Sequence, residues 1–405
     1  MKLHVPFALQ ELAKRIPSLY VVGGYVRNAV WRGDIAGTDV DVCGPLTPDE
    51  VRSVLRDTHY LVLDVNPRIG TVLIKTPDGE YEYTTFRYDS YPIGGAHTPA
   101  EVRFVRTIEE DAGRRDFRMN AIYLSAATGE VVDPTGGVAD IANRLVRTTR
   151  APSLVFGEDG LRILRLVRFA CEMGFAPDAE TFKIARNMRR QLEDISTERK
   201  TAEMERIMLS DTRYGEENAP VKGLQLLQAL GCFPLLGLPD KEADLSACGR
   251  LPAVLSWRLV ALLRALGVED IRCLVGKGMR FPNHLVKEVS RLLGATRAPD
   301  EKQPWLWMVE HAADIEAACI IWRAEGNGAY ADLVEGEQAL LKEKGVPWNY
   351  HGLPVTPEQI KEILPPHFVG EALTYLVVEG ARRRVALSDE QCLLALAEFK
   401  ELKKC

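Results

Sequence analysis

The stretch VVGGYVRNAVWRGDIAGTDVDV, residues 21–42, combines a glycine pair, an arginine and two closely spaced aspartates. The apolar residues before the glycines predict a strand, and the residues after them predict a short helix. Gly23 and Gly24 let backbone N–H groups approach an anion near the start of that helix. Arg27, one turn further on, can donate to the same anion through its guanidinium. A plain tight turn also accounts for the glycines, but it explains neither Arg27 nor the aspartates.

Asp39 and Asp41 are two residues apart in the predicted strand TDVDVCG, residues 38–44. Side chains at i and i+2 of a strand point to the same face, so the two carboxylates can share a pair of divalent cations. Such a pair stabilises the attacking and leaving oxygens of an in-line phosphoryl displacement. Glu82, in the segment YEYTTF, is either a third ligand or base, or an outward-facing strand glutamate. An isolated DxD pattern also occurs in glycosyltransferases and on surface strands.

Two later motifs carry charged side chains. EEDAGRRDFRMNAIYL, residues 109–124, sets two arginines beside Asp116 at a predicted helix–strand junction. GEDGLRILRLVRFACEMGF, residues 157–175, is predicted to be a helix with arginines every three residues, at Arg162, Arg165 and Arg168. Asp159 precedes the first of them by three positions and joins their stripe. The pattern indicates either an intrahelical ion pair with Arg162 or an acceptor and donors aimed at a base edge.

The order of predicted elements indicates an α+β protein. The first third alternates strands and helices, including a helix over 47–57 capped by Thr47, a hairpin over 71–88, a loop over 91–102 and strand segments at 118–125 and 130–137. Beyond about Leu145 strand signals stop and the period is helical. We expect a catalytic head with a mixed sheet, then a helical neck, body and tail, over residues 1–145, 146–205, 206–298 and 299–405.

Composition excludes several classes. The chain has 405 residues, 46% apolar and 27% charged, which is typical of globular proteins with more than one domain. No apolar run approaches the length of a membrane span, and the N-terminal segment is amphipathic, without the apolar core of a signal peptide. The eight cysteines include no CxxC pair, so we expect reduced thiols and a cytoplasmic location rather than a zinc site or disulfide frame.

The net charge of −6 gives no general attraction to nucleic acid, but residues 144–200 are locally basic. A solvated helical face is the simpler explanation, and a surface that follows a phosphate backbone is the other. The cations are Arg144, Arg147, Arg150, Arg162, Arg165, Arg168, Lys183, Arg186, Arg189, Arg190, Arg199 and Lys200.

Together these motifs resemble those of the class II, bacterial-type CCA-adding tRNA nucleotidyltransferases, in the superfamily of the nucleotidyltransferase and poly(A) polymerase head domain. GGYVRN…TDVDV is similar to that family's metal and triphosphate motif, RRDFRMNAIY to the motif linking head and neck, and EDGLRILRLVRFACEMGF to its base-selecting EDxxR motif. Their order and spacing agree with the family. The resemblance is strong over residues 1–200 and weaker to the C-terminus.

The resemblance implies addition of C, C and A to the 3′ end of tRNA from CTP and ATP, without a nucleic-acid template. It assigns Mg²⁺ to Asp39 and Asp41, and the triphosphate to Gly24 and Arg27. It assigns the incoming nucleotide to Arg115, Asp159, Arg162, Arg165 and Arg168. From the residues themselves we add Gly23 to the triphosphate site and Glu82 to the catalytic carboxylates. We expect tRNA to bind the helical body and tail, and we expect no membrane partner.

The chain departs from the family at Asn28, where an acidic residue is common, and in the loop 88–100, which has His97 and Pro99 but no arginine just before that proline. The full length of this loop favours complete CCA addition over a CC-adding specialist. The alternatives are a CC- or A-adding specialist, a poly(A) polymerase, a non-catalytic tRNA-binding protein and a nucleotide-sugar glycosyltransferase. No His-Asp dipeptide occurs, so the phosphohydrolase domain of some relatives is not expected.

Overall fold

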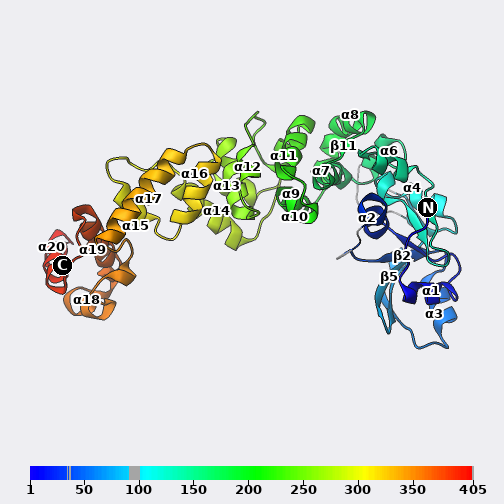
Figure 1. Cartoon of the computed structure of the whole chain (residues 1–405), viewed down its shortest axis with the longest axis horizontal. Helices are drawn as coiled ribbons and strands as arrows, with labels where there is room; N and C mark the ends of the chain where they lie inside the picture. Colours follow the sequence, from blue (N-terminus) through cyan, green and yellow to red (C-terminus); the bar gives the residue numbers. More distant parts are fainter. Residues whose placement is uncertain (34, 36–37, 91–100, 404–405) are drawn as a thin grey trace. The chain divides into compact units, whose positions relative to one another are not determined.

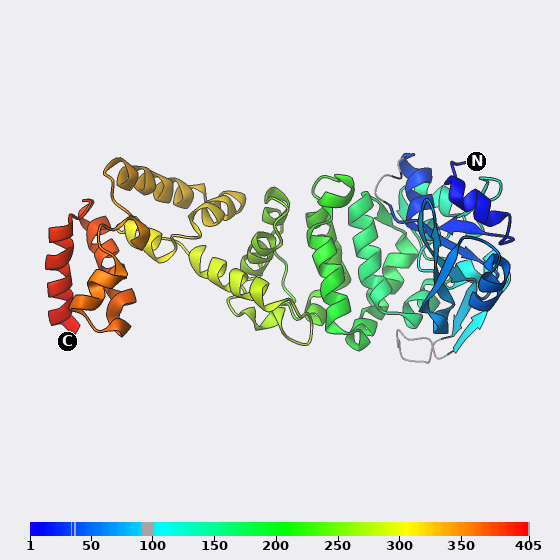
Figure 2. The same cartoon turned by 90° about the horizontal axis from the view of Figure 1, so that it is seen from below.

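A computed structural model describes residues 1–33, 35, 38–90 and 101–403 (Figures 1 and 2). The chain forms two compact units. The first comprises residues 1–240 and 273–280, and the second comprises 241–272 and 281–405. The expected division into head, neck, body and tail remains a prediction, because these two units are separated by their internal contacts and do not test the four boundaries.

The first unit begins with a seven-stranded mixed sheet (Figure 1). Its strand order is β3-β4-β5-β2-β1-β8-β9, with β2 parallel to β5 and every other neighbouring pair antiparallel. The strands are β1 Tyr20–Val22, β2 Asp41–Gly44, β3 Leu61–Asn66, β4 Thr71–Thr76, β5 Gly79–Thr85, β8 Tyr123–Ser125 and β9 Val131–Val132. The expected mixed sheet is therefore confirmed, as is the hairpin of β4 and β5.

Helices and a small hairpin complete this α/β part. The helices are α1 Phe7–Ala13, α2 Gly24–Arg32, α3 Pro48–Leu55, α4 Ile108–Gly113 and α5 Gly137–Ala142. Thr47 caps α3 as predicted, in a capping box with Glu50. β6 Arg87–Ser90 pairs with β7 Glu101–Phe104, so residues 101 and 102 belong to a strand rather than to the predicted loop. Most of that loop, with His97 and Pro99, lies outside the described residues.

The rest of the first unit is helical. Its helices are α6 Pro152–Glu158, α7 Leu161–Met173, α8 Ala179–Met188, α9 Thr197–Met208, α10 Asp211–Tyr214 and α11 Ala219–Leu230. α7 packs against α9 and α11, which is why nearly all of its side chains are buried. The expectation of no strands beyond about Leu145 is wrong in one detail. β10 Leu145–Val146 pairs with β11 Ala176–Pro177, and pairs this short leave no periodic signal.

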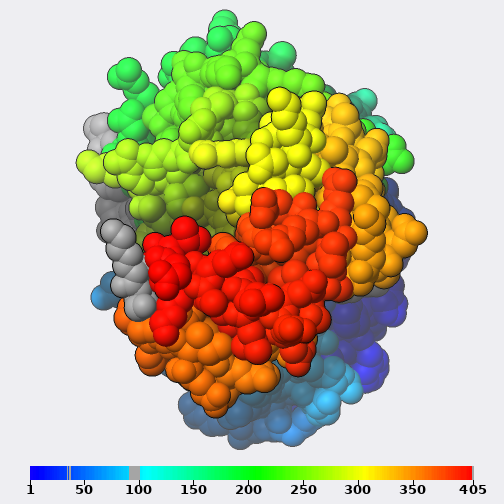
Figure 3. All heavy atoms as spheres, turned by 90° about the vertical axis from the view of Figure 1, so that its left-hand side faces the viewer, coloured from blue at the N-terminus to red at the C-terminus, as the bar shows by residue number. Residues whose placement is uncertain are grey.

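The second unit is helical in its described residues. Its helices are α12 Ala247–Arg250, α13 Leu255–Ala265, α14 Asn283–Ala295, α15 Pro304–Glu310, α16 Ile315–Ala324, α17 Gly328–Glu343, α18 Pro357–Ile363, α19 Val369–Arg383 and α20 Asp389–Lys403. One apolar core surrounds the fully buried Trp322, and another lies among α18, α19 and α20. Figure 3 shows the face of this unit where residues of α19 and α20 gather. Across the described chain, no helix has the length and apolarity needed to cross a bilayer.

Candidate active site

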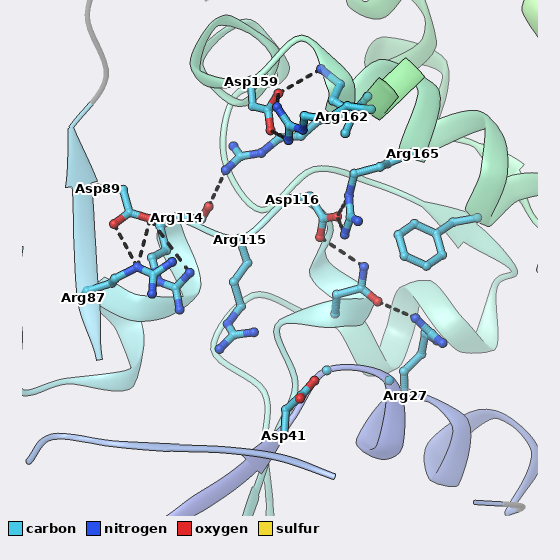
Figure 4. A pocket seen from close by; sticks show the side chains of 16 residues that line it. Arg27, Asp41, Arg87, Asp89, Arg114, Arg115, Asp116, Asp159, Arg162 and Arg165 are labelled. Carbon is cyan, nitrogen blue, oxygen red and sulfur yellow. Dashed lines mark hydrogen bonds and ion pairs between the residues drawn. The ribbon is translucent and has the colours of Figure 1, made fainter. Parts of the chain in front are cut away.

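A pocket of about 420 Å³ in the first unit brings together residues from the sheet, α7 and α9 (Figure 4). This volume falls in the usual range for small-molecule sites. Seven arginines and four aspartates line it among the described residues, so its charge suits a polyanionic ligand. The lining residues are Gly23, Gly24, Arg27, Asp41, Arg87, Asp89, Arg114, Arg115, Asp116, Asn120, Asp159, Leu161, Arg162, Arg165, Phe169 and Arg199.

The glycine pair forms the turn between β1 and α2, as the sequence predicts. Gly23 has a φ of 78°, a conformation that favours glycine, and Gly24 is the first residue of α2. A Cβ on Gly23 would lie 3.6 Å from Oδ2 of Asp41, so the bare backbone and the carboxylate share one corner of the pocket. The first N–H groups of α2 have no helical partner and are free to bind an anion.

Asp41 lies at the edge of the pocket beside two other carboxylates. It is paired in register with Glu82 on the neighbouring strand β5. Burial first, and then the negative charges of Glu82 and Asp39, raise the pKa of Asp41. The predicted strand is too long at its start, because β2 begins at Asp41 and Asp39 is an exposed residue before it. The argument from alternating strand faces therefore does not apply to Asp39, although its charge still acts on Asp41.

Two buried aspartates hold the arginines in the centre of the pocket. Arg115 donates from Nη2 to Oδ2 of Asp111 at 3.0 Å, and the Tyr123 hydroxyl donates to the same oxygen. Asp116 accepts from Nε of Arg165 at 2.8 Å. Burial opposes ionisation of both carboxylates, yet Arg115 and Arg165 hold the pKa values of Asp111 and Asp116 well below the usual range. These arginines are thus fixed before any ligand arrives.

Replacing Asp116 with asparagine should destabilise the first unit by about 3 kcal/mol, because it leaves Arg165 without its buried counter-ion. Urea denaturation at neutral pH measures the effect. A carboxylate whose pKa is depressed in the folded state contributes stability above its unfolded pKa, and this contribution is lost on acidification. The difference in free energy of unfolding between the wild type and Asp116→Asn should therefore become smaller below about pH 4. Asp49→Asn, in an exposed pair with Arg52, is the matched control and should change stability by less than about 0.5 kcal/mol. Equal effects of the two substitutions would contradict the prediction.

The helix predicted over residues 157–175 is broken where Asp159 lies. α6 ends at Glu158, Asp159 has an extended backbone, and α7 starts at Leu161. Of the two interpretations of this motif, the intrahelical ion pair between Asp159 and Arg162 is therefore wrong. Asp159 accepts from Nη2 of Arg199 at 2.9 Å and from the Leu161 backbone N–H at 3.0 Å.

Arg162 has its own partners. It donates to Glu158 Oε2 at 2.9 Å and to the Arg114 carbonyl at 2.7 Å. Both Asp159 and Arg162 still line the pocket, at the end away from Asp41 (Figure 4).

Arg27 and Arg168 are both predicted to bind the nucleotide, but they occupy different environments. Arg27 is buried in the pocket wall and donates from Nη1 to Asn120 Oδ1 at 2.8 Å. Arg168 does not line the pocket. Its guanidinium is buried between Glu203 and Glu172 and lies over the ring of Phe169. Of the nucleotide-binding residues predicted from the sequence, Arg168 alone is thus committed to the helical core, and its contact with a nucleotide stays a prediction.

Sequence reasoning missed several lining residues. Arg87 and Asp89 are two apart on β6 and form an ion pair, with the carboxylate 4% exposed. Their i, i+2 spacing was the available signal. In the sequence, Arg199 is one cation of the basic run and Asn120 lies within the second motif. Nothing local to either position indicates a place in the pocket.

Two family models match this chain. Residues 19–147 match the poly A polymerase head domain, and residues 174–236 match a probable RNA- and SrmB-binding site of polymerase A. The CCA-adding enzyme of Enterococcus faecalis is 30% identical over 401 residues, covering 95% of this chain and 92% of the relative. The CCA-adding enzyme of Geobacillus stearothermophilus is 34% identical over 317 residues, covering 76% and 74%.

Solved structures have the same fold. The CCA-adding enzyme of Bacillus stearothermophilus in complex with CTP matches with a TM-score of 0.72 and 28% identity, covering 98% of each chain. The Thermotoga maritima CCA-adding enzyme complexed with tRNA matches with a TM-score of 0.64 at 17% identity, which is a likeness of fold alone.

Proposed function

Because the chain belongs to the family of the CCA-adding enzymes, we propose that it adds CCA to the 3′ end of tRNA from CTP and ATP by two-metal nucleotidyl transfer. The arrangement of one pocket carries this proposal. Its one end has Asp41 beside the glycine turn, and its other end has Asp159 and Arg162 (Figure 4). A triphosphate at the first end and a base at the second would account for both groups. The tRNA 3′ hydroxyl attacks the α-phosphorus, and pyrophosphate leaves.

Asp39 and Asp41 are the residues that would hold divalent cations, as Mg²⁺. The raised pKa of Asp41 supports this fit, because burial, and then the charges of Glu82 and Asp39, disfavour its negative charge and a bound cation would stabilise it. Mg²⁺ usually keeps several non-protein oxygen ligands, so phosphate oxygens and water would complete the coordination. When bound, the cations activate the attacking hydroxyl and neutralise the leaving pyrophosphate. Glu82 stays a candidate third ligand or base.

Base selection would rest on hydrogen-bond polarity. The exocyclic amines of cytosine and adenine donate, and Asp159 accepts. Arg162 donates to the adjacent ring acceptor of either base. Guanine and uracil present a carbonyl where the amine would be, and an unpaired buried contact of that kind costs about 1–3 kcal/mol. The ion pair with Arg199 and the bond from the Leu161 N–H support this role, because they hold the Asp159 carboxylate in one orientation.

Incubation of the protein with tRNA that lacks its 3′ end tests the proposed function. Labelled CTP, ATP, GTP and UTP are supplied singly and in mixtures. Complete CCA addition is expected with CTP and ATP together, and two cytidines with CTP alone. Incorporation of one nucleotide type in every mixture would identify a CC- or A-adding specialist, and a long adenosine tract would identify a poly(A) polymerase. Binding of tRNA without any incorporation would contradict catalysis.

The basic run over residues 144–200 divides into paired and solvent-facing cations. Six arginines of the run make ion pairs, three of them in the pocket wall, and Lys200 is buried against backbone carbonyls. The exposed members include Lys183 and Arg186 on α8 and Arg190 after it. We therefore assign phosphate contacts with tRNA to these three side chains rather than to the whole run.

Reversing the three charges together, as Lys183→Glu, Arg186→Glu and Arg190→Glu, should weaken tRNA binding and flatten its salt dependence. Each lost phosphate contact lowers the slope of log K against log salt by about 0.7–0.9, so the change should be about 2–3. Filter binding across a salt series measures both quantities. The control carries the same substitutions at Lys2, Lys14 and Arg15 in the head, and its slope should match the wild type. An unchanged slope in the α8 variant would remove the assignment.

A further inference from the structure

Tyr214, at the end of α10, brings a hydroxyl from the helical region to the start of α2. That hydroxyl accepts from Nη2 of Arg27 at 2.8 Å and donates to Oδ1 of Asn28 at 3.1 Å. Nε of Arg213 also donates to it, at 3.2 Å. Tyr214 is therefore hydrogen-bonded to two consecutive residues one turn into α2, although 187 positions separate it from Arg27.

The partners of Arg27 distinguish it from the other arginines in the pocket wall. Within the described chain, the pocket arginines Arg87, Arg114, Arg115, Arg162, Arg165 and Arg199 each pair with a carboxylate. Arg27 instead donates to the amides of Asn28 and Asn120 and to the phenol of Tyr214. Neutral partners orient the guanidinium without cancelling its charge. The positive charge of Arg27 therefore stays available to an anion in the pocket.

The same cluster reaches the segment that carries the first catalytic aspartate. Asn28 accepts from Arg27 and Tyr214 on its Oδ1, and its Nδ2 donates to Oγ1 of Thr38 at 3.2 Å. Asp39 is the next residue of the chain. An acidic residue at position 28 would form an ion pair with Arg27 and reduce its net charge, whereas asparagine with Tyr214 holds the same geometry without that loss.

We propose that Tyr214 is a positioning residue for triphosphate binding, which orients Arg27 through its hydroxyl and joins α10 to the nucleotide site. The inference rests on the proposed function, because it takes Arg27 as a triphosphate contact. The ring of Tyr214 has a separate, structural role. It packs edge-to-face on Trp31, with centroids 5.1 Å apart, and the Arg32 guanidinium lies over it. Phenylalanine keeps that packing and removes only the hydroxyl.

Tyr214→Phe should raise KM for both CTP and ATP about five- to tenfold, the scale of one hydrogen bond, with a smaller change in kcat. The increase should be equal for the two nucleotides, since the triphosphate is common to them. Inhibition by CMP, which lacks the β- and γ-phosphates, should be unchanged. A residue with only a structural role would shift the melting temperature and weaken CTP and CMP alike. Tyr60→Phe, elsewhere in the head, is the matched control and should leave every constant unchanged.

A double-mutant cycle with Arg27→Ala tests separately whether Arg27 contacts the triphosphate and whether Tyr214 acts through Arg27. If Tyr214 acts through Arg27, adding Tyr214→Phe to Arg27→Ala should cause no further loss, so the effects are not additive. An unchanged KM in Tyr214→Phe, or a full additional loss in the double variant, would overturn the inference. Normal CTP binding by Arg27→Ala would instead contradict the assignment of Arg27, and a wild type that incorporates no nucleotide would contradict the proposed function itself.

Discussion

Replacing Asp41 with asparagine should lower incorporation of both CTP and ATP by about 10³-fold or more. Asp41 lines the pocket, lies beside the glycine turn and is paired in register with Glu82. Its loss therefore removes the principal protein ligand of the proposed cations. Asp39→Ala should have the same direction of effect. Single-turnover incorporation with each nucleotide at saturating Mg²⁺ measures the loss. Because the Asp41 side chain lies at the pocket edge rather than in the core, the fold should be retained.

Asp64→Asn is the control for this prediction, since Asp64 is a half-exposed head aspartate on β3 that lies outside the pocket. Its activity and melting temperature should equal those of the wild type. Activity of Asp41→Asn within tenfold of the wild type would exclude Asp41 as a metal ligand. Equal loss in Asp41→Asn and Asp64→Asn would show instead that any charge removed from the head impairs the protein.

Asp159→Ala should change which nucleotide is used as well as how fast. It removes the acceptor that distinguishes an amine from a carbonyl, so UTP and GTP should gain on CTP and ATP by about 1–3 kcal/mol, or roughly 5- to 150-fold in relative kcat/KM. The substitution also releases Arg199, whose two terminal nitrogens both approach Asp159. The released cation can itself donate to a base carbonyl, which acts in the same direction. Measurement of kcat/KM for all four nucleotides gives the ratios.

The matched control is Asp194→Ala, at an exposed position in the same helical region. It should leave the four ratios unchanged. If Asp159 were only the ion-pair partner of Arg199, its removal would lower stability and reduce all four rates together. An equal fall in kcat/KM for all four nucleotides would therefore show that Asp159 has only a structural role as the partner of Arg199.

Much of the fold followed from local signals. Val21 and Val22 before a glycine pair, the alternation around the PDG turn and the Thr47 cap are each decided by residues within a few positions of one another, and the structure has β1, the β4–β5 hairpin and α3 at those places. The boundaries were less accurate. The strand expected from residue 38 begins at Asp41, where its antiparallel neighbour β1 ends at Val22.

The sequence by itself determined the family motifs, the mixed sheet followed by helices, and half of the residues that line the pocket, since these depend on short-range pattern and order. Only the tertiary structure decided which charges meet. The break after Glu158 turns Asp159 away from Arg162 and toward Arg199, 40 residues later. Arg168 is held in the helical core by Glu203, and Tyr214 reaches Arg27 across 187 positions. Charged partners are chosen by proximity after helices pack, and periodicity along one helix contains no information about a carboxylate or hydroxyl that another helix supplies.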